Sequence, residues 1–184
     1  MIAIEALIVQ PELRGERVLL TQLDGRFADG LWSSLQDPEN IRLTGTHQTF
    51  TRAQIDDWAA TRPGREDRAD YALVRISDGA FLGEVVLNDI DEDNDSASFR
   101  ISLAGAHLFG LGYGTEATRL ALDYAFDVLG LHRVGLEVFA HNPRAERVYE
   151  KCGFVREGVL RDALRWEREW HDVVRMSVLV GDRR

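Results

Sequence analysis

Residues 109–126 read FGLGYGTEATRLALDYAF, and this stretch decides the fold. Three glycines stand at alternate positions, Gly110, Gly112 and Gly114, and the chain continues from them into an amphipathic segment. Glycines at the start of a helix expose backbone N–H groups beside the positive end of the helix dipole, and no Cβ keeps a ligand away. The stretch therefore favours the binding of an anion such as a pyrophosphate, with a purely structural turn as the alternative.

The spacing of these glycines excludes two common nucleotide-binding motifs. The dinucleotide pattern G-x-G-x-x-G requires a third glycine at the position that Thr115 occupies here. The P-loop requires a Gly-Lys pair, which the sequence does not contain. The ligand of the turn is therefore sought outside these two nucleotide folds.

The segments that follow the glycines predict a helix, a strand, a helix and two strands. The first helix places its apolar residues three and four apart and ends at Gly130; its predicted buried face is Ala117, Leu120, Ala121, Tyr124, Ala125, Val128 and Leu129. Residues 133–139 alternate as a strand does. Asn142 and Pro143 are typical of an N-cap and a first helical residue, and Gly153 ends that helix. Residues 154–160 and 172–180 are rich in β-formers.

The segments before the glycines predict a strand, two helices and three strands. Residues 13–20 favour one opening strand, and Phe27, Leu31 and Leu35 favour a helix that the turn-forming stretch 34–40 closes. A second helix begins at Thr51, where Gln54 completes a capping box. Three strands follow, at residues 71–76, 81–87 and 96–103. The whole pattern is that of an α/β chain, antiparallel at first and ending with a βαβ crossover.

Composition limits the class of protein. The chain has 184 residues, of which 45% are hydrophobic, and we expect a single domain over residues 1–184. A net charge of −9 argues against nucleic acid as a partner, and the sequence has no apolar run long enough for a membrane span. No signal peptide is recognisable, so the predicted location is cytoplasmic.

No metal site is predicted either. Cys152 is the only cysteine, so a cysteine cage cannot form. The alternating aspartates of residues 89–95 lack the glycine and the glutamate of a calcium loop. The five histidines show no ligand spacing, although His141 adjoins Asn142. These groups are interpreted as ordinary surface or core residues.

Three motifs, in order, resemble one enzyme family. They are GLGYGTEA at residues 110–117, NPRA at 142–145 and YEKCGF at 149–154. Together they resemble the GNAT superfamily of acyl-CoA N-acyltransferases. LRGERVLL near the start and HDVVRMSVL near the end are similar to its RimJ/RimL-like branch, which includes ribosomal-protein N-terminal acetyltransferases. The resemblance covers nearly the whole chain.

The resemblance implies a fold and a cosubstrate. The fold is a mixed twisted sheet of about seven strands with about four helices, splayed between its fourth and fifth strands around acetyl-CoA. Ile101, Ser102 and Leu103 would pair with the pantetheine, and Asn142 and Tyr149 would contact it. The pyrophosphate would lie on Phe109, Gly110, Leu111, Gly112, Tyr113, Gly114 and Thr115. The family's usual basic or polar residues are replaced by Phe109 and Leu111, so backbone N–H groups are expected to carry the anion.

The same resemblance implies catalytic residues. Tyr149 matches the tyrosine that protonates the departing thiolate; a core tyrosine is the alternative. Glu137 precedes it at the spacing of a base and acid pair. The alternative is a strand glutamate that faces a helix and pairs with an arginine. Glu84 is the alternative base. Cys152 is not needed as a nucleophile, because direct transfer to an amine requires none.

The expected activity is direct transfer of an acetyl group from acetyl-CoA to a primary amine, either a protein N-terminus or a small molecule. A noncatalytic CoA-binding regulatory module is the alternative, and a dimerising scaffold ranks last. The assembly is expected to be a monomer or a homodimer. Trp166 and Trp170 fit either a wall of the acceptor site or core packing, and the acceptor itself is not identified by the sequence.

Overall fold

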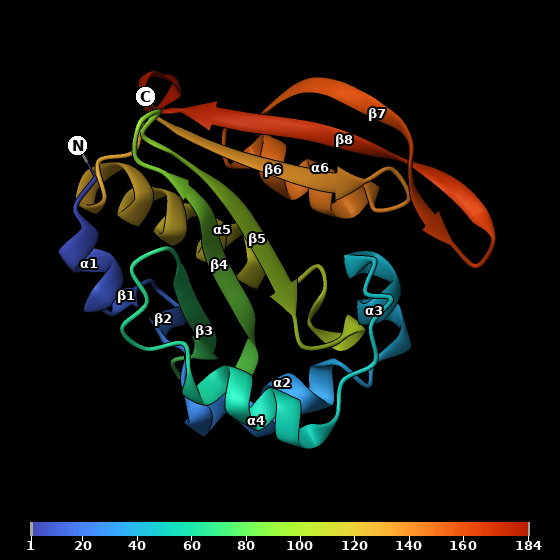
Figure 1. Ribbon diagram of the computed structural model, residues 1–184, viewed down its shortest axis with the longest axis horizontal. Helices are drawn as coiled ribbons and strands as arrows, with labels where there is room; N and C mark the ends of the chain where they lie inside the picture. The colour runs from blue at the N-terminus through green and yellow to red at the C-terminus, as the bar shows by residue number, and fades with distance from the viewer. Residues whose placement is uncertain (1, 184) are drawn as a thin grey trace.

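The computed structural model describes residues 2–183 and contains one mixed sheet in the order β1-β2-β3-β4-β5-β6-β8-β7 (Figure 1). Only β5 and β6 run parallel; every other neighbouring pair is antiparallel. The strands are β1 (Leu13–Arg14), β2 (Val18–Gln22), β3 (Ala69–Arg75), β4 (Phe81–Asp91), β5 (Ser96–Leu103), β6 (Arg133–Phe139), β7 (Val155–Trp166) and β8 (Glu169–Leu179). The predicted α/β class with a mixed, splayed sheet is confirmed. Residues 2–183 form eight strands and six α-helices, where about seven and about four were expected.

Helices cover both faces of this sheet. They are α1 (Ile4–Ile8), α2 (Ala28–Ser34), α3 (Pro38–Thr44), α4 (Arg52–Ala60), α5 (Tyr113–Asp123) and α6 (Pro143–Lys151), with short 3-10 turns at Gly25–Phe27, Ala106–Leu108 and Val180–Asp182. The larger core lies on the side of α1, α5 and α6 and includes Tyr71 and Leu73 of β3. Helices α2 and α4 pack on the other face, against Ala72 and Val74. Alternation along β3 thus divides one strand between two cores.

The sheet opens between β5 and β6. Their pairing begins at Ser96 with Arg133 and ends at Ser98 with Gly135. Beyond this point residues 99–103 and 136–139 diverge, and Figure 1 shows a wedge with α3 near its wide end. Parallel strands that stop pairing leave main-chain N–H and C=O groups available along the gap. The predicted split is therefore present, between the fifth and sixth strands of this chain.

The N-terminal part differs from the prediction in three places. Residues 13–20 form a tight hairpin instead of one strand, because the Gly15 amide donates to the Val18 carbonyl at 2.9 Å. Stretch 34–40 does not simply close a helix: Asp37 accepts from the Asn40 amide at 2.9 Å and begins α3. Helix α1 was not predicted, and it buries Leu7 completely.

The helix after the glycines follows the prediction except at its end. Residues Tyr124–Val128 form a π-helical turn, in which the Leu129 amide donates to the Tyr124 carbonyl at 2.9 Å. The extra residue in this turn rotates the helix face. Val128 is consequently 43% exposed, and its predicted burial is wrong, whereas Leu129 is fully buried as predicted.

Two other local predictions are confirmed. Thr51 and Gln54 form the capping box at the start of α4, and the Asn142 side chain accepts from the Ala145 amide at 3.2 Å to begin α6. Between Ile2 and Arg183, no helix combines the length and the apolar character that crossing a bilayer requires.

Candidate active site

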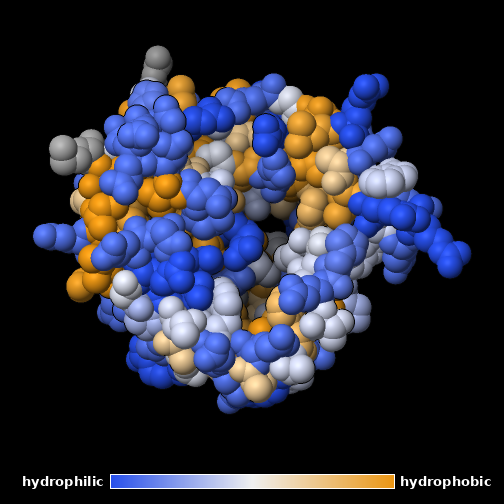
Figure 2. Space-filling view, in the orientation of Figure 1, coloured by the Kyte–Doolittle hydropathy of each residue, from blue (hydrophilic) through white to orange (hydrophobic). Residues whose placement is uncertain are grey.

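A cavity of about 430 Å³ lies in the wedge between β5 and β6, within the size range of small-molecule sites. The space-filling view shows the molecule hollowed at this place (Figure 2). Its walls come from β5, the glycine turn, β6, α6 and α3. The predicted site residues that line it are Ile101, Ser102, Leu103, Phe109, Gly110, Gly112, Gly114, Thr115, Glu137, Asn142 and Tyr149.

The glycine turn is an open anion site by its geometry. Gly110 and Gly112 have φ angles of 76° and 86°, which L side chains rarely adopt, and α5 begins directly after them. Within residues 2–183, the backbone N–H groups of residues 110–115 have no main-chain acceptor. A Cβ at Gly110 or Gly114 would meet nothing within 4 Å, whereas a Cβ at Gly112 would lie 2.7 Å from Arg17 Nη2. The approach to the turn is therefore clear at Gly110 and Gly114. The arrangement favours a negatively charged ligand.

Arg17, from the β1–β2 hairpin, braces the outer side of this turn. Its Nη1 donates to the Leu111 carbonyl at 3.0 Å, and its guanidinium lies 5.0 Å from the Tyr113 ring centroid. Its backbone amide donates to Glu116 at 2.8 Å. Leu111 and Tyr113 thus contact the hairpin and lie outside the cavity lining, although both were predicted to contact the cosubstrate.

Four basic side chains line the cavity, and none of them was predicted to be a site residue. They are Arg100 of β5 and Arg144, Arg147 and Lys151 of α6. The three on α6 are spaced three and four residues apart, which places them on one face of the helix. This spacing is the signal in the sequence that could have predicted a basic helix face. A protein with a net charge of −9 therefore places four cations in the wall of this cavity.

Tyr149 points its ring into the core beside the cavity and is 8% exposed. Its ring meets those of Phe99 and Phe154 edge-on, at centroid distances of 6.2 and 5.8 Å. Burial raises the pKa of this phenol. The Tyr149 phenol therefore keeps its proton at neutral pH, and the residue lines the cavity.

Glu137 lies on the opposite face of β6 from Tyr149. Its neighbours Leu136 and Val138 belong to the core that contains Tyr149, whereas Glu137 points the other way and accepts from Arg175 Nε at 2.9 Å. The Glu137 side chain is 50% exposed. An acid and a base on the two faces of a split strand can serve reactants that arrive from two sides.

Glu84, the alternative base, lies outside the cavity lining. It stands on β4 between Ala72 and Ser102 in the strand register. Its Oε2 atom is buried without a hydrogen-bond partner, and burial raises the pKa of the carboxyl group. The position favours a role in the packing beneath α2 and α4.

Helix α3 forms a wall of the cavity and is fixed to β5. The Ser102 hydroxyl donates to Asn40 Oδ1 at 2.9 Å, and Asn40 Nδ2 donates to the Ser34 carbonyl at 3.0 Å. Leu43 and Thr44 also line the cavity. These residues escaped sequence reasoning, since stretch 34–40 was interpreted as a turn.

Aromatic side chains gather beyond the wide end of the wedge. Phe139 stacks on His141 at 5.5 Å, and His141 meets His171 at 4.9 Å. Burial lowers the pKa of His141, whose Nε2 lies 3.2 Å from the Arg42 carbonyl. Trp166 packs on His47 at 5.2 Å, whereas Trp170 is 58% exposed. No group of three candidate metal ligands occurs among residues 2–183.

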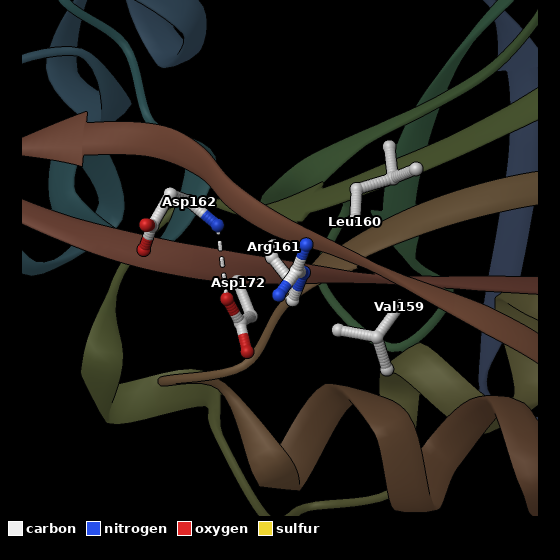
Figure 3. A pocket seen from close by; sticks show the side chains of 5 residues that line it. All are labelled: Val159, Leu160, Arg161, Asp162 and Asp172. Atoms are coloured by element: carbon white, nitrogen blue, oxygen red, sulfur yellow. Dashed lines mark hydrogen bonds between the residues drawn. The ribbon is translucent and has the colours of Figure 1, made fainter.

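A second hollow, of about 630 Å³, lies on the β7–β8 hairpin. It is lined by Val159, Leu160, Arg161, Asp162 and Asp172 (Figure 3). The β7 register shifts here, and the Asp162 amide donates to the Asp172 carboxylate at 2.9 Å. This contact uses the Asp172 carboxylate within the hairpin itself.

Sequence comparison matches residues 17–155 to the acetyltransferase (GNAT) domain. The chain belongs to the GNAT acetyltransferase family. Among its GNAT relatives is spermidine N(1)-acetyltransferase of Vibrio cholerae serotype O1, with 40% identity over 98 residues. This match spans 53% of the chain and 56% of that relative's length.

Two further comparisons extend this relationship. A putative ribosomal N-acetyltransferase, YdaF of Bacillus subtilis, is 31% identical over 134 residues, covering 71% of the chain and 69% of YdaF. The GNAT fold is also that of the crystal structure of spermidine N-acetyltransferase from Vibrio cholerae in complex with CoA and spermine. The TM-score is 0.84 and the identity 24%, over 91% of the chain and 98% of that structure.

Proposed function

We propose that the protein transfers an acetyl group from acetyl-CoA to a primary amine of a small molecule. The observation that carries this proposal is the single cavity, in the split of the sheet, that both the open glycine turn and Tyr149 line. Membership of the GNAT family supports it. The first relatives match over little more than half their length, so the activity is inferred from this chain's own residues together with the family.

The residues of the cavity fit the acyl donor. The unpaired N–H groups of residues 110–115 suit the diphosphate, and the cations of α6 lie beside them. Residues 101–103 line the gap where β5 no longer pairs with β6, so their main chain is available to the pantetheine amides. The side-chain NH₂ of Asn142 has no partner within residues 2–183 and fits the same arm.

The reaction proceeds by direct transfer. The acetyl thioester supplies the electrophilic carbon; a C–N bond to the amine forms and the C–S bond breaks. Glu137 accepts the proton that the amine loses, directly or through water, and Tyr149 donates a proton to the sulfur. Unpaired N–H groups of β5 stabilise the oxyanion. Tyr149 and Glu137 lie on opposite faces of β6, which suits a donor and an acceptor entering from opposite sides.

A small polyamine is the acceptor that the relatives favour. The 40% identical relative carries the name spermidine N(1)-acetyltransferase. Glu137, which lines the cavity with a half-exposed side chain, offers negative charge to a polycation. The similarity to YdaF favours a second candidate, an N-terminal acetyltransferase of the RimJ/RimL-like branch acting on a ribosomal protein.

The decisive experiment measures thiol release from acetyl-CoA with spermidine, an aminoglycoside and a ribosomal-protein N-terminal peptide. We expect the highest kcat/KM with spermidine. A preference for the peptide would favour the RimJ/RimL-like assignment. Tight CoA binding in calorimetry without release on any amine would identify a noncatalytic CoA-binding module instead.

The cytoplasmic location and the monomeric or homodimeric state remain predictions. Size-exclusion chromatography with light scattering tests the second. A larger assembly would contradict it.

A further inference from the structure

Arg144 and Phe109 form a stacked pair across the mouth of the cavity. Phe109 immediately precedes the glycine turn, and Arg144 lies in the first turn of α6, so the two residues come from opposite walls of the wedge. The Arg144 guanidinium carbon lies 3.8 Å from the centroid of the Phe109 ring. At this distance the cation is attracted by the face of the ring.

The guanidinium of Arg144 has no polar partner in the described part of the chain. Arg42, Arg133 and Arg175 are all paired with carboxylates, but no ion pair or hydrogen bond involves Arg144 within residues 2–183. Glu39 is the carboxylate whose pKa Arg42 and, to a smaller extent, Arg144 lower. Its two oxygens are occupied by Arg42 at 2.9 and 2.8 Å.

Stacking on the ring leaves the edge of the guanidinium free. The five N–H donors of arginine lie in the plane of the group, so an aromatic platform orients them without using any of them. Arg144 is half-buried and lines the cavity, as does Phe109. The pair therefore presents a fixed cation at the edge of a turn that has no basic side chain of its own.

We propose that Phe109 holds Arg144 as the cation that binds the diphosphate of the acyl donor. This inference rests on the proposed function and adds two residues to it: Arg144 as a binding residue and Phe109 as a positioning residue. The aromatic residue at position 109 supplies no charge itself. It fixes a charge that comes from the opposite wall, so that the diphosphate is bound from both sides of the wedge.

The test is a double-mutant cycle on CoA affinity, measured by calorimetry. We expect R144A to weaken CoA binding about tenfold, since a charge-assisted contact is lost. F109A is expected to weaken it about threefold, and the double variant no more than R144A alone. F109L keeps the apolar volume without the aromatic face and should behave as F109A.

Two controls separate positioning from packing. S-acetylpantetheine lacks the diphosphate, and its kcat/KM should stay within about twofold of wild type in all variants. R147A removes a cation of the same helix face, and its effect should multiply with that of F109A.

Three outcomes would overturn the proposed positioning of Arg144 by Phe109. They are multiplicative effects of F109A and R144A on CoA affinity, an equal loss of kcat/KM with S-acetylpantetheine, and CoA affinity that is unchanged in the variants. In each of these cases the proposed function still stands if the wild-type protein transfers acetyl groups. Absence of CoA binding to the wild-type protein would overturn both proposals.

Discussion

Strand β5 has two seams, its pairing with β4 and its pairing with β6, and the two differ in length. Towards β4, β5 pairs from Asp91–Ser96 to Gly83–Leu103, along its whole length. Towards β6, pairing ends at Ser98–Gly135. The same strand therefore has one side devoted to stability and one side that is left open. An incomplete ladder is costly for a sheet, and here the gap coincides with the cavity and with the candidate acid Tyr149.

Two glycines provide the sharpest way to separate these seams. Gly83 stands on the closed side with φ 146°, where a Cβ would lie 2.0 Å from the Ser102 carbonyl oxygen. We expect G83A to lower the free energy of unfolding by about 3 kcal/mol, because backbone must move and the φ angle is strained. Urea denaturation measures this. G158A, on β7 with open space around it, is the matched control.

Gly114 on the open side should give the reverse result. Alanine suits its helical backbone, and we expect G114A to leave the free energy of unfolding unchanged or raised by about 0.5 kcal/mol. Gly114 lines the cavity, so an added methyl group should obstruct the diphosphate and raise KM for acetyl-CoA about tenfold. A destabilised G114A with normal KM would contradict the division between the seams.

The largest effect on catalysis is expected at Tyr149. Removing its hydroxyl in Y149F takes away the proton donor and should lower kcat about 100-fold, while CoA affinity changes less than about twofold. Stopped-flow thiol release and calorimetry measure the two quantities. In the matched control Y124F, a tyrosine loses a 2.7 Å hydrogen bond to the Ala6 carbonyl. It should cost about 1 kcal/mol of stability without changing kcat. Equal kcat in both variants would remove Tyr149 from the mechanism.

The smallest effect concerns Glu84, on the closed side of β5. Burial raises the pKa of its carboxyl group above the ordinary 4.5, so the folded protein binds this proton more tightly than the unfolded chain. Its contribution to stability is therefore greatest below the ordinary pKa and decreases as the pH rises toward the folded pKa.

The variant E84Q removes this dependence. It should melt about 3 °C above wild type at about pH 8 and close to wild type at about pH 5, with acetyl transfer retained. Melting curves at the two pH values, with thiol-release assays, provide the check. A steeper pH dependence in E84Q, or loss of transfer, would point to Glu84 as the base.

Local signals predicted most of the fold, and one such signal was interpreted in two ways. Asn142-Pro143 was interpreted as a helix start and begins α6, whereas Asp37-Pro38, with the same chemistry, was interpreted as a turn and begins α3. The second helix is only seven residues long, so it has little apolar periodicity to confirm its cap. Its omission removed one wall of the cavity from the prediction.

The site was predictable where it depends on one segment and not where segments meet. The turn and Tyr149 lie within continuous motifs. The pairing of Glu137 with Arg175 is set by strand register, and the stack of Arg144 on Phe109 by the width of the wedge. Because Phe109 and Leu111 are not basic, sequence reasoning expected the anion to be held mainly by backbone N–H groups. It did not consider cations from α6.

The open seam is also equivalent to two edge strands inside the molecule. Residues 99–103 and 136–139 face a gap with main-chain groups that they do not share with each other. An edge of this kind accepts any extended polypeptide that matches its spacing. A flexible affinity tag or the tail of a neighbouring molecule would compete with pantetheine for these groups, so tag-free protein is the appropriate sample for affinity measurements.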